Sequence, residues 1–190
     1  MPESEYMSKV KLARFDPTDG LERGVGRFKE SLWYLVKMLF FLTAFPVPQT
    51  IKTICLSWFG AKIGKGTVIK PRVNIHMPWK LELGDYSWIG EEVFILNFEP
   101  VKIGKNVCIS QRAFLCGGNH DYRDPVFKYR NGPITIRDGA WIGANCFVGP
   151  NVTIGTDAVV GAGSVVTANL DANSIYKGNP ACRVKSRWDD

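Results

Sequence analysis

The sequence predicts an all-β protein, a three-sided solenoid of six-residue repeats with a helical cap at its N-terminal end. Between residues 63 and 171, fourteen complete hexads begin with Ile, Leu or Val, eight have Gly second, and eleven have Ser, Thr, Ala, Val or Cys fifth. An amphipathic helix would need apolar residues at intervals of three and four, and a simple strand would alternate by two. A fixed period of six with recurrent Gly therefore indicates a repeat architecture.

Each position of the hexad has a physical reason. A branched aliphatic residue at the first position fills the interior of a narrow coil, and a small residue at the fifth fits where the backbone turns a corner. Gly at the second position lets the backbone bend with φ above zero, or fits in close quarters. We expect these preferences to hold along the whole stack.

The spacing of the turns locates one interruption. Three hexads make one triangular turn, and turns begin 20 residues apart early in the series and 18 apart late in it. Ile103 and Ile136, however, are 33 apart, about 13 residues more than a 20-residue turn. The extra residues predict an excursion loop over 116–133, CGGNHDYRDPVFKYRNGP. Loops that leave a rigid scaffold are where function concentrates.

The flanks of the repeats divide the chain into an N-terminal extension and helical cap (1–59), the solenoid (60–172) and an exit segment (173–190). The apolar run within 24–48 is shorter than the about 20 residues that a bilayer span needs. We expect it to cover the open end of the stack, because a repeat array requires a cap. The alternative is peripheral contact with a membrane, with Trp33 and Tyr34 at the headgroups.

Composition bounds the partners and the compartment. The net charge of +6 fits an anionic ligand such as a phosphate-bearing cofactor, an acidic membrane surface, or a basic surface with no partner. Five scattered cysteines without a CxxC pair argue against a zinc knuckle or a redox motif. With no visible secretory signal, we expect a cytoplasmic protein. A further option is a cytoplasmic protein that associates with the inner face of the membrane. No nucleic-acid-binding module is recognised.

His120, inside the excursion, is the strongest candidate for catalysis. An imidazole titrates near pH 6.5 and so accepts a proton at neutral pH. The neighbouring Asp121 is expected to orient it, although adjacency in sequence does not guarantee contact. On the residues alone, a structural or solvated histidine remains the alternative.

The hexads resemble the hexapeptide-repeat acyltransferases, whose fold is a left-handed parallel β-helix. WFGAKIGKG, HMPWKLELGDYSWIG, ISQRAFLCGGNHDYRDPVF and the GNPA exit are most similar to the branch typified by colanic-acid-biosynthesis acetyltransferases. The galactoside, maltose and nodulation acetyltransferases are similar more loosely. The resemblance covers about residues 60–188. It implies transfer of acetyl from acetyl-CoA to a sugar hydroxyl, with His120 as general base, direct attack in a ternary complex, and a homotrimer that encloses the site.

The resemblance also implies a cofactor path along the later coils. The residues that the resemblance assigns to acetyl-CoA binding are Trp141, Ala144, Ala162, Thr167 and Arg183. The alternative for the small residues is a packing role, because the corners of the coils need small residues in any case. Ala168 stands where many relatives have Lys, which puts that phosphate contact in doubt. For the acceptor we expect Asn97, Asp85, Tyr122 and Arg123, with a structural corner bond as the equal alternative for Asn97.

Four rival functions remain at this point. N-acetylation of an amino sugar uses the same base, and a non-catalytic trimeric scaffold needs none. A zinc carbonic anhydrase on this fold needs three histidine ligands, and the chain has only His76 and His120, so no metal is expected. Cys116 lies four residues before His120 and is a candidate acyl carrier, although a plain core role is the simpler interpretation.

Overall fold

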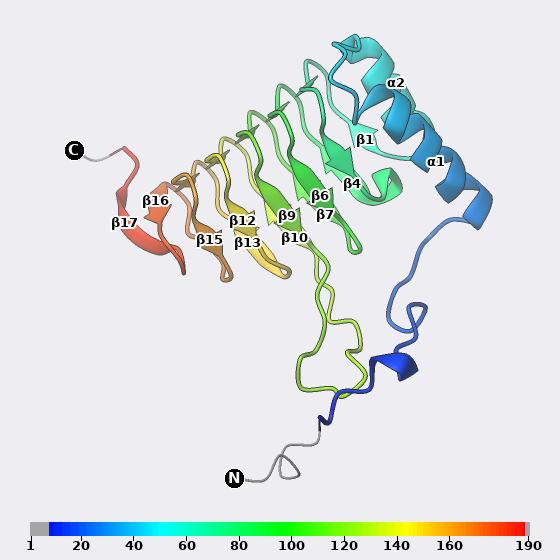
Figure 1. The fold of residues 1–190 in the computed structure, drawn as a ribbon. Helices are drawn as coiled ribbons and strands as arrows, with labels where there is room; N and C mark the ends of the chain where they lie inside the picture. Colours follow the sequence, from blue (N-terminus) through cyan, green and yellow to red (C-terminus); the bar gives the residue numbers. More distant parts are fainter. Residues whose placement is uncertain (1–7, 189–190) are drawn as a thin grey trace, which may run out of the picture.

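The computed structural model describes residues 8–188 and shows a stack of coils with two helices at one end and two C-terminal strands at the other (Figure 1). Each of the first five coils contributes one short strand to each of three sheets. Sheet A has the order β1 (Lys62–Ile63), β4 (Leu81–Leu83), β7 (Val101–Ile103), β10 (Ile134–Ile136) and β13 (Val152–Ile154). Sheet C has the order β15 (Val165–Val166), β12 (Phe147–Val148), β9 (Phe114–Cys116), β6 (Phe94–Leu96) and β3 (Asn74–Ile75).

In each coil the strand of sheet B follows the strand of sheet A and precedes the strand of sheet C. Sheet B also includes the last two strands of the chain. Its order is β17 (Cys182–Ser186), β16 (Ser174–Lys177), β14 (Val159–Val160), β11 (Trp141–Ile142), β8 (Cys108–Ile109), β5 (Trp88–Ile89) and β2 (Val68–Ile69). All pairs are parallel except β16 with β17, which are antiparallel. The chain passes from A to B to C in each coil, so the prism has an A–B, a B–C and a C–A edge.

The strand register confirms the coil lengths expected from the sequence. Lys62 pairs with Glu82, and Ile134 pairs with Val152. Between them, Ile134 pairs with Val101 across the interruption. The excursion of residues 117–133 therefore leaves the stack at the C–A edge, between β9 and β10, without disturbing the pairing on either side.

The core is built from the first and fifth positions of the hexads. Ile69, Ile89 and Ile109 are first-position residues stacked in sheet B, and each is at most 1% exposed. Fifth-position residues such as Ala113 and Ala158 are also fully buried. Burial of one large aliphatic side chain contributes about 1.5–3 kcal/mol, so a repeated column of them stabilises the stack.

Glycine at the second position serves close packing between coils. A Cβ on Gly84 would lie 2.5 Å from the carbonyl carbon of Gly104 in the next coil. The left-handed backbone falls instead at the fourth position, as at Tyr86 (φ 57°) and Asn145 (φ 57°). Two reasons were expected for Gly at the second position. The prediction of close packing is confirmed, and the prediction of a positive φ is wrong.

Helices α1 (Arg27–Phe40) and α2 (Gln49–Trp58) cover the first coil, as the cap prediction expected. Trp33 of α1 is fully buried and donates its indole N–H to the Ile75 carbonyl at 3.0 Å. At the open edge of β2, the Gln49 amide accepts from the Ile69 N–H at 2.8 Å and donates to the Ile69 carbonyl at 2.9 Å. A side-chain amide thus satisfies the sheet edge in place of a further strand.

A buried lysine completes the same edge. Lys52 is 1% exposed, and its ammonium donates to the carbonyls of Ile69 and Lys70 at 2.8 and 3.2 Å. Burial, and then the charge of Lys70, lowers the pKa of Lys52. The cap therefore contains polar contacts as well as the apolar contacts that its composition suggests.

Candidate active site

Residues 117–133 form a hairpin-like arm that projects from the C–A edge (Figure 1). His120 and Tyr129 face each other in an antiparallel bridge. The Asp121 N–H donates to the Lys128 carbonyl, and the Arg130 N–H to the Asn119 carbonyl, each at 2.8 Å. These bonds place the histidine on an ordered ladder.

The His120 ring is half-buried and its two nitrogens have different surroundings. Nδ1 lies 2.6 Å from the carbonyl oxygen of Phe127. A carbonyl can only accept, so Nδ1 carries the proton in the neutral ring and Nε2 keeps its lone pair. Among residues 8–188, no hydrogen-bond partner is found for Nε2. The arrangement suits a ring that accepts a proton at Nε2.

Asp121 does not take the orienting role expected of it. Its carboxylate accepts from the Arg123 N–H at 3.0 Å, which fixes the turn at the tip of the arm. Successive residues of an extended ladder point to opposite sides, so the neighbour of His120 points away from the ring. The Phe127 carbonyl orients the imidazole in place of Asp121.

Asn97, one of the expected acceptor residues, lies at the C–A edge beside the foot of the arm but does not face solvent. Asn97 is fully buried, and its amide accepts from the Met77 N–H at 2.8 Å and donates to the Met77 carbonyl at 2.5 Å. This is the structural corner bond, so the substrate role for Asn97 is corrected.

Asp85 lies at the A–B edge, between β4 and β5, whereas the arm leaves at the C–A edge. Its carboxylate accepts from the Lys65 N–H at 3.0 Å and lies 3.6 Å from the Lys105 ammonium. The expectation that Asp85 reaches the same cleft as His120 is therefore wrong within one chain.

Tyr122 and Arg123 are at the exposed tip of the arm. Tyr122 is 71% exposed, and the Arg123 guanidinium lies 5.5 Å from the centre of its ring. Both are free to meet a ligand or a neighbouring chain.

A cavity of about 480 Å³ lies at the foot of the arm. Thr167 lines it, as do Asn119 and Arg130 from the two strands of the arm. The rest of the lining comes from Cys116, Gly118, Phe147, Gly149, Pro150 and Asn151. Asn119, the sequence neighbour of His120, lines the cavity, whereas the imidazole itself does not.

The other cofactor candidates occupy different surfaces. Ala144 and Ala162 lie in successive coils at the B–C edge, where the Gly163 N–H donates to the Ala144 carbonyl at 2.8 Å. Trp141 is half-exposed on sheet B and donates its indole N–H to the Ser110 hydroxyl at 2.9 Å. Arg183 is exposed on β17 and donates from Nε to the Ser174 hydroxyl at 3.0 Å. One chain alone does not bring these residues to His120.

Cys116 has the surroundings of a packed thiol. Its sulfur lies 3.1 Å from the Gly118 carbonyl, and burial raises the pKa of the thiol. A nucleophilic cysteine needs a lowered pKa, so this environment does not favour a covalent route.

Sequence reasoning missed three residues around the histidine: Phe15, Phe127 and Tyr129. Tyr129 stacks on the His120 ring with centroids 4.9 Å apart, and Phe15 meets the ring edge-on at 5.3 Å. The crowding of aromatics around 120–130 was the available signal for Phe127 and Tyr129. Nothing in the sequence indicated Phe15.

The structure is thus a solenoid of hexads with a histidine on an arm that leaves one edge, and with a surface cavity at the foot of that arm. No group of three or more His, Cys, Asp or Glu side chains suited to a metal occurs between residues 8 and 188. Comparison with known proteins defines the class further.

The family described as "Bacterial transferase hexapeptide (six repeats)" matches residues 133–168. A protein of Escherichia coli (strain K12) named for colanic acid biosynthesis, the acetyltransferase WcaF, is 41% identical over 165 residues, which cover 87% of this chain and 91% of that protein. The chain therefore belongs to the hexapeptide-repeat acetyltransferases.

Solved structures agree on the fold. The hexapeptide-repeat acetyltransferase VCA0836 of Vibrio cholerae O1 biovar eltor, complexed with acetyl coenzyme A, is 24% identical with a TM-score of 0.77 and covers 96% of this chain and 100% of its own. A galactoside acetyltransferase in complex with coenzyme A is also 24% identical, with a TM-score of 0.76, covering 84% of this chain and 81% of its own.

Proposed function

We propose that this acetyltransferase moves acetyl from acetyl-CoA to a hydroxyl of a sugar or glycoconjugate, with His120 as general base. The observation that carries the proposal is the bond from His120 Nδ1 to the Phe127 carbonyl, which leaves Nε2 as the proton acceptor. The name of the relative from Escherichia coli supports a polysaccharide precursor as the acceptor.

The reaction is a direct attack in a ternary complex. Nε2 takes the proton of the acceptor hydroxyl while that oxygen bonds to the thioester carbonyl carbon. The tetrahedral oxyanion collapses, the C–S bond breaks, and the imidazolium returns its proton to the CoA thiolate. General-base action contributes about a hundredfold to ten-thousandfold, and holding the two substrates together adds more.

Acetyl-CoA is the proposed acyl donor, and the solved relatives that carry it or CoA support the assignment. The proposed contacts for the pantetheine chain of the cofactor are Thr167, in the cavity at the foot of the arm, and Ala144 and Ala162, at the B–C edge. Alanine suits this task because the backbone amide bonds while a small side chain lets a thin ligand approach. Trp141 and Arg183 complete the proposed path.

A homotrimer would unite these parts. His120 and Thr167 are at the C–A edge, and Ala144 and Ala162 are at the B–C edge. A threefold arrangement would place the arm of one chain against the B–C edge of the next. Inactive His120→Ala and Ala162→Trp chains, mixed under dissociating conditions and reassociated, should recover activity. Failure of correctly reassembled mixed trimers would contradict a shared site.

The protein is also proposed to be cytoplasmic and to touch a membrane through residues 24–48. No helix within 8–188 is long and apolar enough to cross a membrane. The outward side of α1 and the turn after it expose large apolar side chains, namely Phe28, Leu32, Leu35, Met38, Leu39, Leu42 and Phe45. Sedimentation with vesicles, and its loss in Leu35→Glu/Leu39→Glu, tests the contact; an unchanged bound fraction would contradict it.

The reaction itself is tested with acetyl-CoA and a panel of sugars, nucleotide sugars and amino sugars. Thiol release should depend on a hydroxyl acceptor and should match the ester formed mole for mole. Amide formation on an amino sugar alone would favour the N-acetyl alternative. Cys116→Ser should keep most of the turnover, whereas a thousandfold loss would favour a covalent route.

A further inference from the structure

We propose that the N-terminal strap, residues 8–23, is a positioning element for the catalytic histidine and acts through Phe15. This inference rests on the proposed role of His120 as base. It adds a segment from the N-terminal part of the chain to the active site.

The strap runs beside the outer part of the arm in Figure 1, where the dark blue segment meets the green-yellow loop. The Lys11 N–H donates to the Pro125 carbonyl at the tip at 2.7 Å. Further along, Asp19 pairs with Lys128 at 3.4 Å. The Gly20 carbonyl accepts from the Asn131 amide at 3.3 Å, near the base of the arm. The strap thus contacts the arm from tip to base.

Phe15 lies between these contacts and meets the histidine. It follows a 3-10 turn, η2 (Leu12–Arg14), and its N–H donates to the Leu12 carbonyl at 2.9 Å. Its ring is edge-on to both His120 and Tyr129, with centroids 5.3 Å away in each case. Tyr129 covers one face of the imidazole at 4.9 Å. The imidazole is therefore packed by two aromatic rings and bonded at Nδ1.

This packing bears on which nitrogen faces the acceptor. The χ2 torsion of histidine has a broad, twofold preference, so a ring flip exchanges the positions of nitrogen and carbon atoms. The bond to the Phe127 carbonyl forms in one orientation only. Packing against Phe15 and Tyr129 restricts rotation of the imidazole, so it opposes the flip and keeps Nδ1 on the Phe127 carbonyl.

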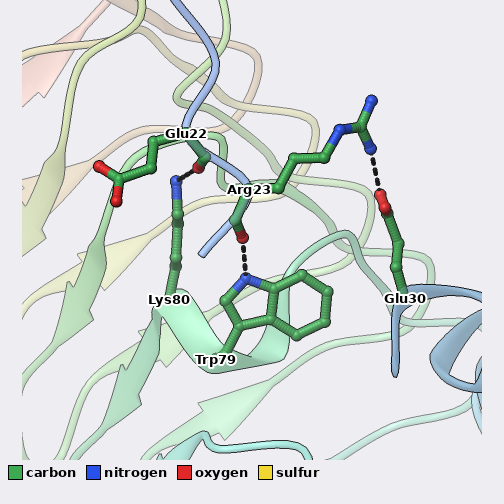
Figure 2. A network of polar contacts seen from close by, with 5 residues as sticks. All are labelled: Glu22, Arg23, Glu30, Trp79 and Lys80. Atoms are coloured by element: carbon green, nitrogen blue, oxygen red, sulfur yellow. Dashed lines mark hydrogen bonds and ion pairs between the residues drawn. The ribbon is translucent and has the colours of Figure 1, made fainter. Parts of the chain in front are cut away.

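The strap is fixed at its other end to the first coil and the cap (Figure 2). The Trp79 indole, in η3 (Pro78–Lys80), donates to the Arg23 carbonyl at 2.6 Å. Lys80 donates to the Glu22 carbonyl, and the Arg23 side chain pairs with Glu30 of α1. The strap therefore spans from the rigid end of the stack to the projecting arm, and it can brace the arm against that end.

The test uses the full chain with Phe15→Ala, Phe15→Tyr and Leu12→Ala. Leu12 is 61% exposed on the same strap and serves as the matched control. Phe15→Ala should lower kcat about tenfold through loss of ring alignment, with the KM for acetyl-CoA and the Tm little changed. Phe15→Tyr retains the ring and should restore most of kcat, and Leu12→Ala should behave as the unmodified protein.

A double-mutant cycle separates positioning from other roles. In a His120→Ala background, Phe15→Ala should reduce the residual rate no further, because its effect passes through the imidazole. An equal loss in both backgrounds, an unchanged kcat in Phe15→Ala, or a gain of activity would overturn the proposal. A gain would mean that the strap covers the site.

A spectroscopic measurement keeps this inference separate from the proposed function. The chain has two histidines, so 15N-histidine NMR shows two imidazoles, which His76→Gln assigns. His120 should appear as the Nδ1–H tautomer in the unmodified protein and as an exchanging mixture in Phe15→Ala. An unchanged tautomer in Phe15→Ala contradicts the role of the strap, whereas full activity of His120→Ala contradicts the base.

Discussion

The coils of the stack and the arm of residues 117–133 differ in what holds each residue in place. In the coils, Ile89 lies between equivalent isoleucines of the coils before and after it, so each contact is repeated along the stack. In the arm, His120 depends on Phe127, Tyr129 and Phe15, each used once. Repetition gives rigidity in the stack, whereas the arm obtains its order from unrepeated contacts, two of them within the arm and one with a distant segment.

The largest effect should come from a small change inside the stack. Gly84→Ala places a Cβ 2.5 Å from the Gly104 carbonyl carbon and forces two coils apart. We expect a loss of about 3 kcal/mol in the free energy of unfolding, measured by denaturant titration. Gly149→Ala is the matched control, because its nearest atom would be 3.4 Å away. Equal stability of the two variants would contradict close packing as the reason for glycine.

Acid should weaken the junction of the cap and the first coils through His76. Burial, and then the charge of Lys37, lowers the pKa of His76 from 6.5 to about 4. Between these values the unfolded chain binds the proton more readily, so stability falls as pH drops from 6.5 towards 4, by about 3 kcal/mol at most. His76→Gln should flatten this part of the profile of Tm against pH. An identical acid profile in the variant would contradict the assignment.

Replacing Asn97 tests whether this residue has a structural role or binds the substrate. Asn97→Ala removes the two bonds to Met77 and leaves buried backbone groups unpaired. We expect a loss of about 2 kcal/mol in unfolding free energy, with the acceptor KM of the folded enzyme unchanged. A raised acceptor KM at unchanged stability would restore the substrate role.

Asp121→Asn should have the smallest effect. The asparagine oxygen can still accept from the Arg123 N–H, so the turn persists. We expect kcat to fall less than about threefold, since the side chain does not orient the imidazole. A loss of a hundredfold or more, as for a partner that fixes the ring tautomer, would show that the carboxylate reaches the histidine during turnover.

The repeat period predicted the coils, their lengths and the site of the excursion, because one rule acts at every coil. It did not locate the left-handed residues, since Tyr86 and Arg72 at the fourth position carry no glycine-like signal. Nor did it predict that Gln49 and Lys52 satisfy the open edge of β2, because polar residues in a helix usually face solvent.

In the arm, the sequence predicted a role for His120, which remains a prediction, and it paired the ring with a residue that the structure does not place against it. Adjacency suggested Asp121, whereas the pleat of the ladder turns neighbouring side chains apart. The contact with Phe15 joins residues more than a hundred positions apart, and neither residue belongs to a hexad. Periodic contacts can be predicted from one chain, and single long-range contacts cannot.

The most direct measurement is the turnover of His120→Ala at saturating acetyl-CoA and acceptor, with Tm as the control for folding. The account predicts a kcat at least about a hundredfold below that of the unmodified enzyme, with unchanged Tm and acetyl-CoA KM. A folded variant that acetylates the acceptor at the original rate would show that Nε2 takes no proton in the reaction.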